Sequence, residues 1–348
     1  MFLRLYATSK STASSFVILI STFYFCASIL QQMKIVILDG HTLNPGDLSW
    51  EDIEALGQVD IYERTSYQEI VERASRAEVV LINKSVMDES NLSQLPRLKF
   101  IGVTATGYNT IDLEACHKQN ITVSNVPGYG STSVSQHTFA LILSLTNHVE
   151  QHHNHVVSGG WANSPDWSYG ITPLMELKDK TMGIVGLGQI GQKVAQIALG
   201  FEMKVLANSR TQKNIMQKIP MVELDTIFKE SDIVSLHCPL TPENEGMINK
   251  DRLQTMKRSA FLINTARGQL VNEVDLADAI SEGTIAGAGL DVLSQEPPPS
   301  DHPLIGIPSC LVTPHHAWAT RESRLRLMEI LVKNVNAYLK GNPINVVG

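Results

Sequence analysis

Short apolar runs rich in β-branched residues alternate along this chain with segments whose apolar residues recur at helical spacing. In the first part of the chain these apolar runs cover residues 34–38, 58–62, 79–83, 100–104 and 121–126. Segments with one polar face, such as 67–77 and 111–118, lie between them. Buried strands that alternate with helices are typical of βαβ units. The pattern therefore predicts a parallel sheet with helices on both faces.

The alternation is interrupted by a Pro- and Gly-rich stretch at 126–130, and a long helical segment follows at 131–148. Further apolar runs then occupy 181–186, 205–210, 233–238, 261–266, 285–292 and 310–313. A last helical segment at 321–338 comes too late to add to this second sheet, so we expect it to pack on the first. We therefore predict an α/β chain of two Rossmann-like or flavodoxin-like domains with a cleft between them. The first is discontinuous and comprises 33–130 plus 316–348, and the second comprises 131–315.

The first 32 residues do not share the alternating pattern of the two domains. An apolar run of 15 residues, 16–30, follows Arg4 and Lys10, which is short for a spanning helix and resembles a signal-peptide core. The other interpretation is a natural start at Met33, because 33–40 already has the pattern of a first strand in a cytosolic α/β domain. We favour the start at Met33 and expect a cytoplasmic protein whose core is not in a membrane.

A glycine motif follows the first strand of the second domain. It reads Gly186, Gly188, Gln189, Ile190 and Gly191, and the apolar residues after it recur at helical spacing. In a strand–turn–helix context the first glycine allows a tight turn, the second a close approach of a pyrophosphate, and the third close packing of helix on sheet. The free N–H groups at the helix start favour an anion. The motif predicts a dinucleotide site.

Composition and charge narrow the class of protein. The 348 residues are 43% hydrophobic and 18% charged, as in a soluble globular protein of two domains. A net charge of −7 argues against a nucleic-acid partner, which would require a basic surface. The four cysteines are scattered without metal-ligand spacing. His148, His152 and His155 share a helical spacing but have no nearby acidic or thiol ligand, so we expect a solvated face and no metal.

Three strand ends in the second domain carry residues suited to acid–base chemistry. Arg267 follows the run at 261–266, Asp291 and Glu296 follow the next, and His315 follows the last. Ligands in open α/β sheets gather at the carboxyl ends of strands. A planar guanidinium suits a substrate carboxylate, and a histidine held by a carboxylate can exchange the proton of a hydroxyl. We expect His316, on an extended segment, to point away from His315.

These residues occur in five ordered motifs, at 186–191, 231–241, 264–268, 290–297 and 313–315. From Met33 to the C-terminus the sequence resembles the D-isomer-specific 2-hydroxyacid dehydrogenases, above all their glycerate dehydrogenase and hydroxypyruvate reductase branch. The resemblance implies that Arg267, Glu296 and His315 are catalytic and that Asp291 contacts the nicotinamide carboxamide. It implies further cofactor contacts from Cys238, Pro239, Thr265 and Ala266.

The resemblance also implies roles for residues away from the strand ends of the second domain. A loop at 104–109, with Thr106 and Gly107, matches the family's loop for the substrate carboxylate, and Asn83 and Lys84 match residues that line the same cleft. Family members are usually homodimers that pair through their cofactor domains, and Gly159–Trp161 lies in the matching arm.

Cofactor preference depends on the end of the strand at 205–210. NAD-dependent enzymes usually carry an acidic residue there for the ribose hydroxyls. Ser209 holds that place here, and Arg210 beside it could pair with a 2′-phosphate. The sequence favours NADP over NAD and leaves both open.

The expected reaction is hydride transfer between NAD(P)H and a small 2-keto acid, converting hydroxypyruvate or glyoxylate to D-glycerate or glycolate. Larger 2-keto acids remain open as substrates. Formate dehydrogenases share the arginine and histidine, but the resemblance to them would require Gln in place of Glu296. A corepressor-like protein that senses the dinucleotide is the alternative that is not an enzyme, because such a protein can retain all three catalytic residues.

Overall fold

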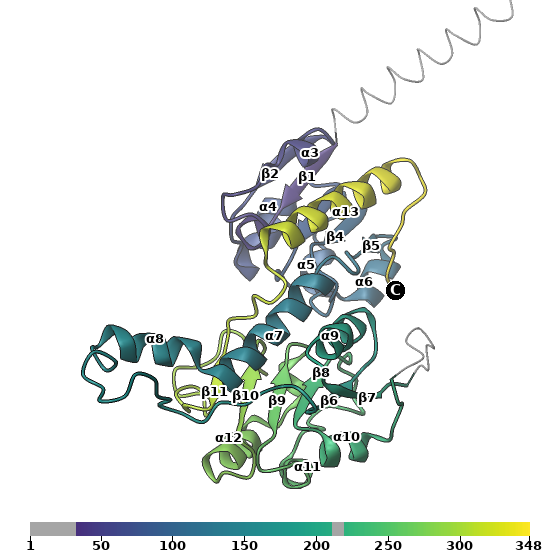
Figure 1. Cartoon of the computed structure of the whole chain (residues 1–348). Helices are drawn as coiled ribbons and strands as arrows, with labels where there is room; N and C mark the ends of the chain where they lie inside the picture. The colour runs from purple at the N-terminus through teal and green to yellow at the C-terminus, as the bar shows by residue number, and fades with distance from the viewer. Residues whose placement is uncertain (1–32, 211–218) are drawn as a thin grey trace, which may run out of the picture. The chain divides into compact units, whose positions relative to one another are not determined.

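The computed structural model describes residues 33–210 and 219–348, and these form two compact units (Figure 1). One unit consists of 33–129 together with 324–348, and the other of 130–323. Each unit contains one parallel sheet, which confirms the predicted α/β class. The predictions for residues 1–32 lie outside the described residues. Within the described part of the chain, no helix is both long and apolar enough to cross a membrane.

The first unit is built on a five-stranded sheet in which the strand order is β2-β1-β3-β4-β5 and every pairing is parallel. Its strands are β1 (Lys34–Ile37), β2 (Gln58–Ile61), β3 (Val79–Ile82), β4 (Phe100–Val103) and β5 (Thr122–Ser124). This is the flavodoxin-like order: β2 lies on one side of β1, and the later strands are added on the other side, beginning with β3. The ends of β1 and β3 therefore lie at the point where such sheets bind ligands.

Short helices and one long helix cover this sheet. They are α2 (Gly40–Leu43), α3 (Glu51–Glu54), the 3₁₀ turn η1 (Tyr67–Glu69), α4 (Ile70–Ala74), α5 (Glu89–Leu92), α6 (Leu113–Lys118) and α13 (Arg321–Leu339). Asp88 and Asp112 accept the backbone N–H groups of Asn91 and Ala115, so each begins its helix as an N-cap. Most of α13 belongs to this unit, where the Tyr338 ring lies 4.7 Å from that of Phe100 on β4. The last helix therefore packs on the first sheet, as predicted.

The second unit is built on a six-stranded parallel sheet of order β11-β10-β9-β8-β6-β7. Its strands are β6 (Thr181–Val185), β7 (Lys204–Asn208), β8 (Ile233–Leu236), β9 (Phe261–Asn264), β10 (Gly287–Leu290) and β11 (Cys310–Val312). Met221 adds a single parallel bridge to Ala207 on the outer side of β7. With that bridge counted as a short strand, the order is that of a dinucleotide-binding fold. The strands after β6 are added first on the β7 side and then, from β8 onward, on the other side.

Helices enclose the second sheet on both faces (Figure 1). They are α7 (Ser131–Asn147), α9 (Gln189–Gly200), α10 (Leu224–Glu230), α11 (Lys250–Gln254), the 3₁₀ turn η2 (Gly268–Leu270) and α12 (Glu273–Ser281). Helix α8 (Val149–Val157) extends away from the sheet (Figure 1) and has no buried residue. Met182 and Ile184 of β6 pack with α7 and α9 in one core, whereas Val185 belongs to the core with α10 and α12. Strands buried on both faces explain the continuous apolar runs of the sequence.

Candidate active site

The glycine motif forms the turn from β6 into α9. Gly186 has a φ of +98°, a conformation that favours glycine, and donates its N–H to the Asn208 carbonyl at 2.8 Å. A Cβ on Gly191 would lie 2.1 Å from the Gly186 carbonyl oxygen, so the helix packs directly on the turn. A Cβ on Gly188 would meet nothing within 4 Å. Gln189 and Ile190 open α9, whose N-terminal N–H groups follow this open space.

The neighbouring strand ends bring Arg210 and Cys238 into one electrostatic environment. Burial raises the pKa of the Cys238 thiol, and the Arg210 guanidinium partly offsets that rise. Ser209 is half-buried and Arg210 is exposed. The Pro239 carbonyl accepts the side-chain amide of Asn244 at 2.9 Å, which holds the loop after β8. These residues, all predicted to contact the cofactor, thus lie at the ends of the adjacent strands β6, β7 and β8.

Arg267 follows β9 in a turn fixed by Asn264. The Asn264 side chain accepts the N–H of Ala266 at 3.0 Å and donates to the Arg267 carbonyl at 2.8 Å. The next residue, Gly268, has no room for a side chain, because a Cβ there would lie 1.9 Å from the carbonyl carbon of Leu293. The turn that carries Arg267 therefore packs against the backbone of the loop that carries Glu296.

Glu296 and His315 meet although 19 residues separate them in sequence. The Glu296 Oε2 lies 2.5 Å from His315 Nδ1, and its Oε1 accepts the Leu293 N–H at 3.2 Å. Both side chains are about one-third exposed. An ionised carboxylate can only accept, so Nδ1 carries a proton and Nε2 is the atom that can gain or lose one. The structure brings together the two residues predicted to form the acid–base pair.

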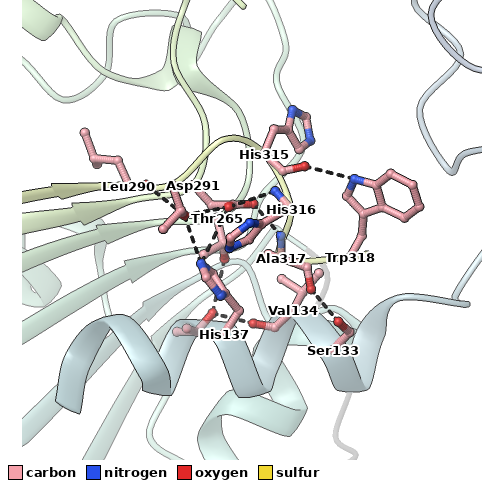
Figure 2. Close-up of polar contacts among 12 residues, drawn as sticks. Ser133, Val134, His137, Thr265, Leu290, Asp291, His315, His316, Ala317 and Trp318 are labelled. Atoms are coloured by element: carbon pink, nitrogen blue, oxygen red, sulfur yellow. Dashed lines mark hydrogen bonds and ion pairs between the residues drawn. The ribbon is translucent and has the colours of Figure 1, made fainter. Parts of the chain in front are cut away.

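Asp291, directly after β10, is the centre of a hydrogen-bond network (Figure 2). Its side chain is 1% exposed. Oδ1 accepts the Thr313 hydroxyl at 2.7 Å and the His316 N–H at 3.0 Å, and Oδ2 accepts the Ala317 N–H at 2.9 Å. His315 has a φ of +50°, so 315–316 is a turn and the predicted extended segment is wrong. In Figure 2 the His315 ring points away from the Asp291 carboxylate, whereas the His316 ring lies beside His137.

His137 of α7 completes this network. Its Nε2 lies 2.9 Å from Thr313 Oγ1 and 3.5 Å from Asp291 Oδ1. Burial lowers the pKa of His137. Together with Asp291 and His316 it has the residue types of a metal site, with ligand atoms within 4.8 Å of one another. Because the Asp291 oxygens and the His137 Nε2 already take part in protein hydrogen bonds, we treat the group as a hydrogen-bond network. Thr265 is tied to the same helix, with its hydroxyl 3.2 Å from that of Thr138.

In the first unit, the predicted substrate residues follow β3 and β4. The Asn83 side chain is buried and donates to the Thr104 carbonyl at 2.8 Å. The Lys84 side chain is exposed, and the Thr106 hydroxyl donates to the Val126 carbonyl at 2.9 Å. Gly107 lies in the loop after β4. The sequence therefore indicated two loops of the first unit that are held by hydrogen bonds to the neighbouring segments.

Comparison with known proteins identifies the family. Residues 139–317 match the domain described as "D-isomer specific 2-hydroxyacid dehydrogenase, NAD binding domain". The chain is 45% identical over 320 residues to the hydroxypyruvate reductase of Blautia hydrogenotrophica, covering 90% of this chain and 99% of that protein. The chain belongs to the D-isomer specific 2-hydroxyacid dehydrogenase family. This dehydrogenase is therefore an oxidoreductase, as the sequence predicted.

Two further comparisons support the same assignment. The dehydrogenase is 40% identical over 317 residues to the glycerate dehydrogenase of Methylorubrum extorquens, covering 90% of this chain and 98% of that protein. A solved acyclic imino acid reductase in complex with NADPH and D-Arg is 32% identical and superposes with a TM-score of 0.81, covering 91% of this chain and 100% of that one. The matched domain is described as NAD binding, and the solved neighbour holds NADPH. A nicotinamide dinucleotide is therefore the dehydrogenase's cofactor.

The residues of the dehydrogenase fit this cofactor. The positive φ of Gly186 and the open space at Gly188 leave room for a diphosphate at the start of α9. The buried Asp291 carboxylate, at the carboxyl edge of the same sheet, is fixed by protein donors on both oxygens. These features are those of a built dinucleotide site.

Three residues that hold these turns and loops were not predicted from the sequence. Asn264 fixes the Arg267 turn, and His137 reaches the Thr313 hydroxyl. In the first unit, Asp39 Oδ2 accepts the N–H groups of Asn83, Lys84 and Ser85 at 2.8–2.9 Å. The only sequence signal for Asp39 is an acidic residue directly after a first strand, and for His137 there is none.

Proposed function

We propose that this dehydrogenase reduces hydroxypyruvate and glyoxylate to D-glycerate and glycolate, with NADPH preferred over NADH. The observation that carries the proposal is the pairing of Glu296 with His315 beside the Arg267 turn. Two relatives that cover nearly the whole chain are named hydroxypyruvate reductase and glycerate dehydrogenase, which supports a small 2-keto acid as substrate.

His315 is the proton donor of the reduction. The charged ring gives its Nε2 proton to the substrate carbonyl oxygen as the carbonyl carbon gains a hydride, and the ring becomes neutral. In the oxidative direction neutral His315 takes the hydroxyl proton back. Glu296 holds the ring through Nδ1 at 2.5 Å, so the same nitrogen faces the substrate in both directions.

Arg267 binds the substrate's carboxylate or carbonyl with its planar guanidinium. The Asn264 hydrogen bonds and the close packing of Gly268 support this role, because they fix the backbone from which the side chain extends. We assign Asn83, Lys84, Thr106 and Gly107 to substrate binding as well. The fixed loops in which they lie support that assignment.

The cofactor, when bound, supplies or accepts the hydride. Gly186, Gly188, Gln189, Ile190 and Gly191 hold its diphosphate. The contacts to its adenosine and nicotinamide nucleotides are assigned to residues at the ends of β7 to β10, namely Ser209, Arg210, Cys238, Pro239, Thr265, Ala266 and Asp291. The Asp291 carboxylate accepts a hydrogen bond from the N–H₂ group of the nicotinamide carboxamide, and its deep burial supports a fixed acceptor there.

NADPH is preferred because no carboxylate ends β7. Ser209 has no negative charge to repel a phosphate, and the exposed Arg210 guanidinium can pair with a 2′-phosphate. Replacing Ser209 by Asp should shift the ratio of kcat/KM values toward NADH, whereas Ser209→Ala should not. A wild-type enzyme that favours NADH would contradict the argument from this strand end.

The dehydrogenase forms a homodimer through the second unit. Apolar side chains are exposed on the arm that follows α7, among them Val157 at 71%, Trp167 at 89% and Leu174 at 59%. Several large apolar side chains left exposed on one segment support a protein interface there. Light scattering should therefore give a mass of about twice the 38.3 kDa of one chain.

A panel of 2-keto acids assayed with NADPH and with NADH tests the proposal. Hydroxypyruvate and glyoxylate should give the highest kcat/KM values, ahead of pyruvate and branched-chain 2-keto acids. Higher kcat/KM values for the larger acids would contradict hydroxypyruvate and glyoxylate as the substrates. Binding of the dinucleotide without turnover of any acid would favour the sensing function over the enzyme.

A further inference from the structure

His137 is a half-buried titratable side chain that the proposed reaction does not use. It lies on α7, with 17% of its side chain exposed, and reaches the turn that follows β11. Its Nε2 is 2.9 Å from the Thr313 hydroxyl oxygen. Thr313 in turn lies 2.7 Å from Asp291 Oδ1. His137 is therefore connected to the Asp291 carboxylate through one hydroxyl group.

The protons of this connection can be assigned from the acceptors. A hydroxyl has one hydrogen, and the ionised Asp291 can only accept, so Thr313 donates to Oδ1 at 2.7 Å in preference to the Leu290 carbonyl at 3.4 Å. Thr313 then has only lone pairs to offer His137. The His137 Nε2 must carry a proton and donate it. The neutral ring that burial favours meets this requirement with one tautomer.

The Asp291 carboxylate can accept one further hydrogen bond. Oδ1 accepts two hydrogen bonds, from the Thr313 hydroxyl and the His316 N–H. Among the described residues, Oδ2 accepts one, from the Ala317 N–H. A carboxylate oxygen can accept about two hydrogen bonds, so Oδ2 can take one more from a ligand. Rotation of the carboxylate would exchange the two oxygens, and the hydrogen bond from Thr313 to Oδ1 opposes that rotation.

Helix α7 is fastened to this edge of the sheet at two other places. The Ser133 hydroxyl donates to the Ala317 carbonyl at 2.5 Å, and the Thr138 hydroxyl lies 3.2 Å from that of Thr265 (Figure 2). His137 lies between these two attachments in sequence. These two hydroxyl groups can therefore hold the helix in place without the imidazole, which leaves the ring a role specific to Thr313 and Asp291.

We propose that His137 is a positioning residue: its Nε2–H holds the Thr313 hydroxyl, and through it the Asp291 carboxylate, in the orientation that accepts the nicotinamide carboxamide. The inference rests on the proposed contact between Asp291 and that carboxamide. It predicts that the contribution of His137 is confined to the nicotinamide half of the cofactor.

The test compares ligands with and without the nicotinamide. Calorimetric dissociation constants are measured for NADPH against 2′-phospho-ADP-ribose and for NADH against ADP-ribose, with the full chain and its His137→Ala and His137→Gln variants. His137→Ala should weaken binding of the dinucleotides about tenfold, as expected for loss of a hydrogen bond within a charged network. Binding of the nicotinamide-free ligands should change less than about twofold, since the turn at Gly186 is held by its own backbone hydrogen bond to Asn208 and not by His137. The glutamine amide can donate to Thr313, so His137→Gln should recover most of the lost affinity.

His117→Ala is the matched control, because it removes an exposed imidazole from α6 of the other unit and should change none of these constants. Equal losses for both kinds of ligand in His137→Ala would mean a structural role and overturn the inference, as would unchanged dinucleotide affinity. Wild-type protein that binds NADPH and NADH no more tightly than their nicotinamide-free counterparts would instead refute the proposed role of Asp291, and with it the inference. If His137→Ala does not fold, the glutamine variant decides: wild-type discrimination supports the role and its loss contradicts it.

Discussion

His237 should make the second unit sensitive to acid. The residue follows β8, and burial lowers its pKa to about 3. Its Nε2 lies 2.9 Å from the Ser235 hydroxyl, and its Nδ1 is buried without a hydrogen-bond partner among the described residues. The folded protein thus has no acceptor ready for a second ring proton at this site.

The size and sign of the effect follow from linkage. An unfolded chain protonates His237 near pH 6.5, whereas the folded chain keeps it neutral down to about pH 3. Between these values the unfolded state binds more protons, so stability rises with pH, is fully present above about pH 6.5, and falls as the pH drops toward 3. At pH 5.0 the loss is about 1.5 × 1.36, or roughly 2 kcal/mol. For a unit of this size that corresponds to about 4–8 °C in Tm.

Thermal unfolding at pH 7.5 and pH 5.0 measures this loss. Three of the four tryptophans, Trp161, Trp167 and Trp318, belong to the second unit, so tryptophan fluorescence reports mainly on it. His237→Gln removes the titrating group and should shrink the fall in Tm by about 4–8 °C. His117→Gln, at an exposed position of the other unit, should leave the fall unchanged. An equal fall in wild type and His237→Gln would refute the argument.

Three further substitutions test the site and its supports. His315→Gln should lower kcat by about 10²–10⁴-fold while cofactor affinity stays within about twofold, and equal losses in both would make the residue structural. Gly268→Ala places a Cβ 1.9 Å from the backbone of Leu293, so the Arg267 turn must move, and kcat should fall about 100-fold in steady-state assays. Asp39→Asn removes a carboxylate that accepts three N–H groups and the Ser85 hydroxyl, and should cost the first unit about 1–3 kcal/mol in urea unfolding.

The strands were predictable because they are buried on both faces. β3 and β8 are buried at every position, so their sequences are continuous apolar runs. The predicted runs extend past the strand ends, as at 261–266, where β9 ends at Asn264. Asn264 is the last residue of the ladder, and its side chain bonds to the turn that follows. Apolar pattern alone does not contain that side-chain contact.

The contact between Glu296 and His315 was predictable for a different reason. Glu296 and His315 follow neighbouring parallel strands, β10 and β11, whose carboxyl ends lie at one edge of the sheet. Strand order therefore suffices to bring them close, and the 2.5 Å contact agrees. His137 belongs to a helix that reaches the same edge from one face of the sheet, and the sequence gives no measure of which helical residue faces which turn.

The turn at His315 shows why an extended segment was the wrong prediction. In a strand, successive N–H groups point to opposite sides. Here the N–H groups of His316 and Ala317 both donate to the Asp291 carboxylate, and that of His315 donates to the Asp291 carbonyl. The positive φ of His315 allows three consecutive donors to converge on one residue. The same reversal lets the His315 side chain face Glu296.

This convergence bears on how Asp291 should be interpreted. Two backbone N–H groups and the Thr313 hydroxyl converge on its carboxylate, so an amide in its place would set its own N–H₂ against at least one protein donor. The fold therefore requires an acidic side chain at this position before any ligand binds. An aspartate here is then weak evidence of function by itself, because the protein's own donors account for it. Glu296 differs, since its Oε2 is directed at a partly exposed imidazole. The proposed chemistry accordingly depends on the Glu296–His315 pair. The role proposed for Asp291 follows from its place beside that pair, because the turn at His315 binds both.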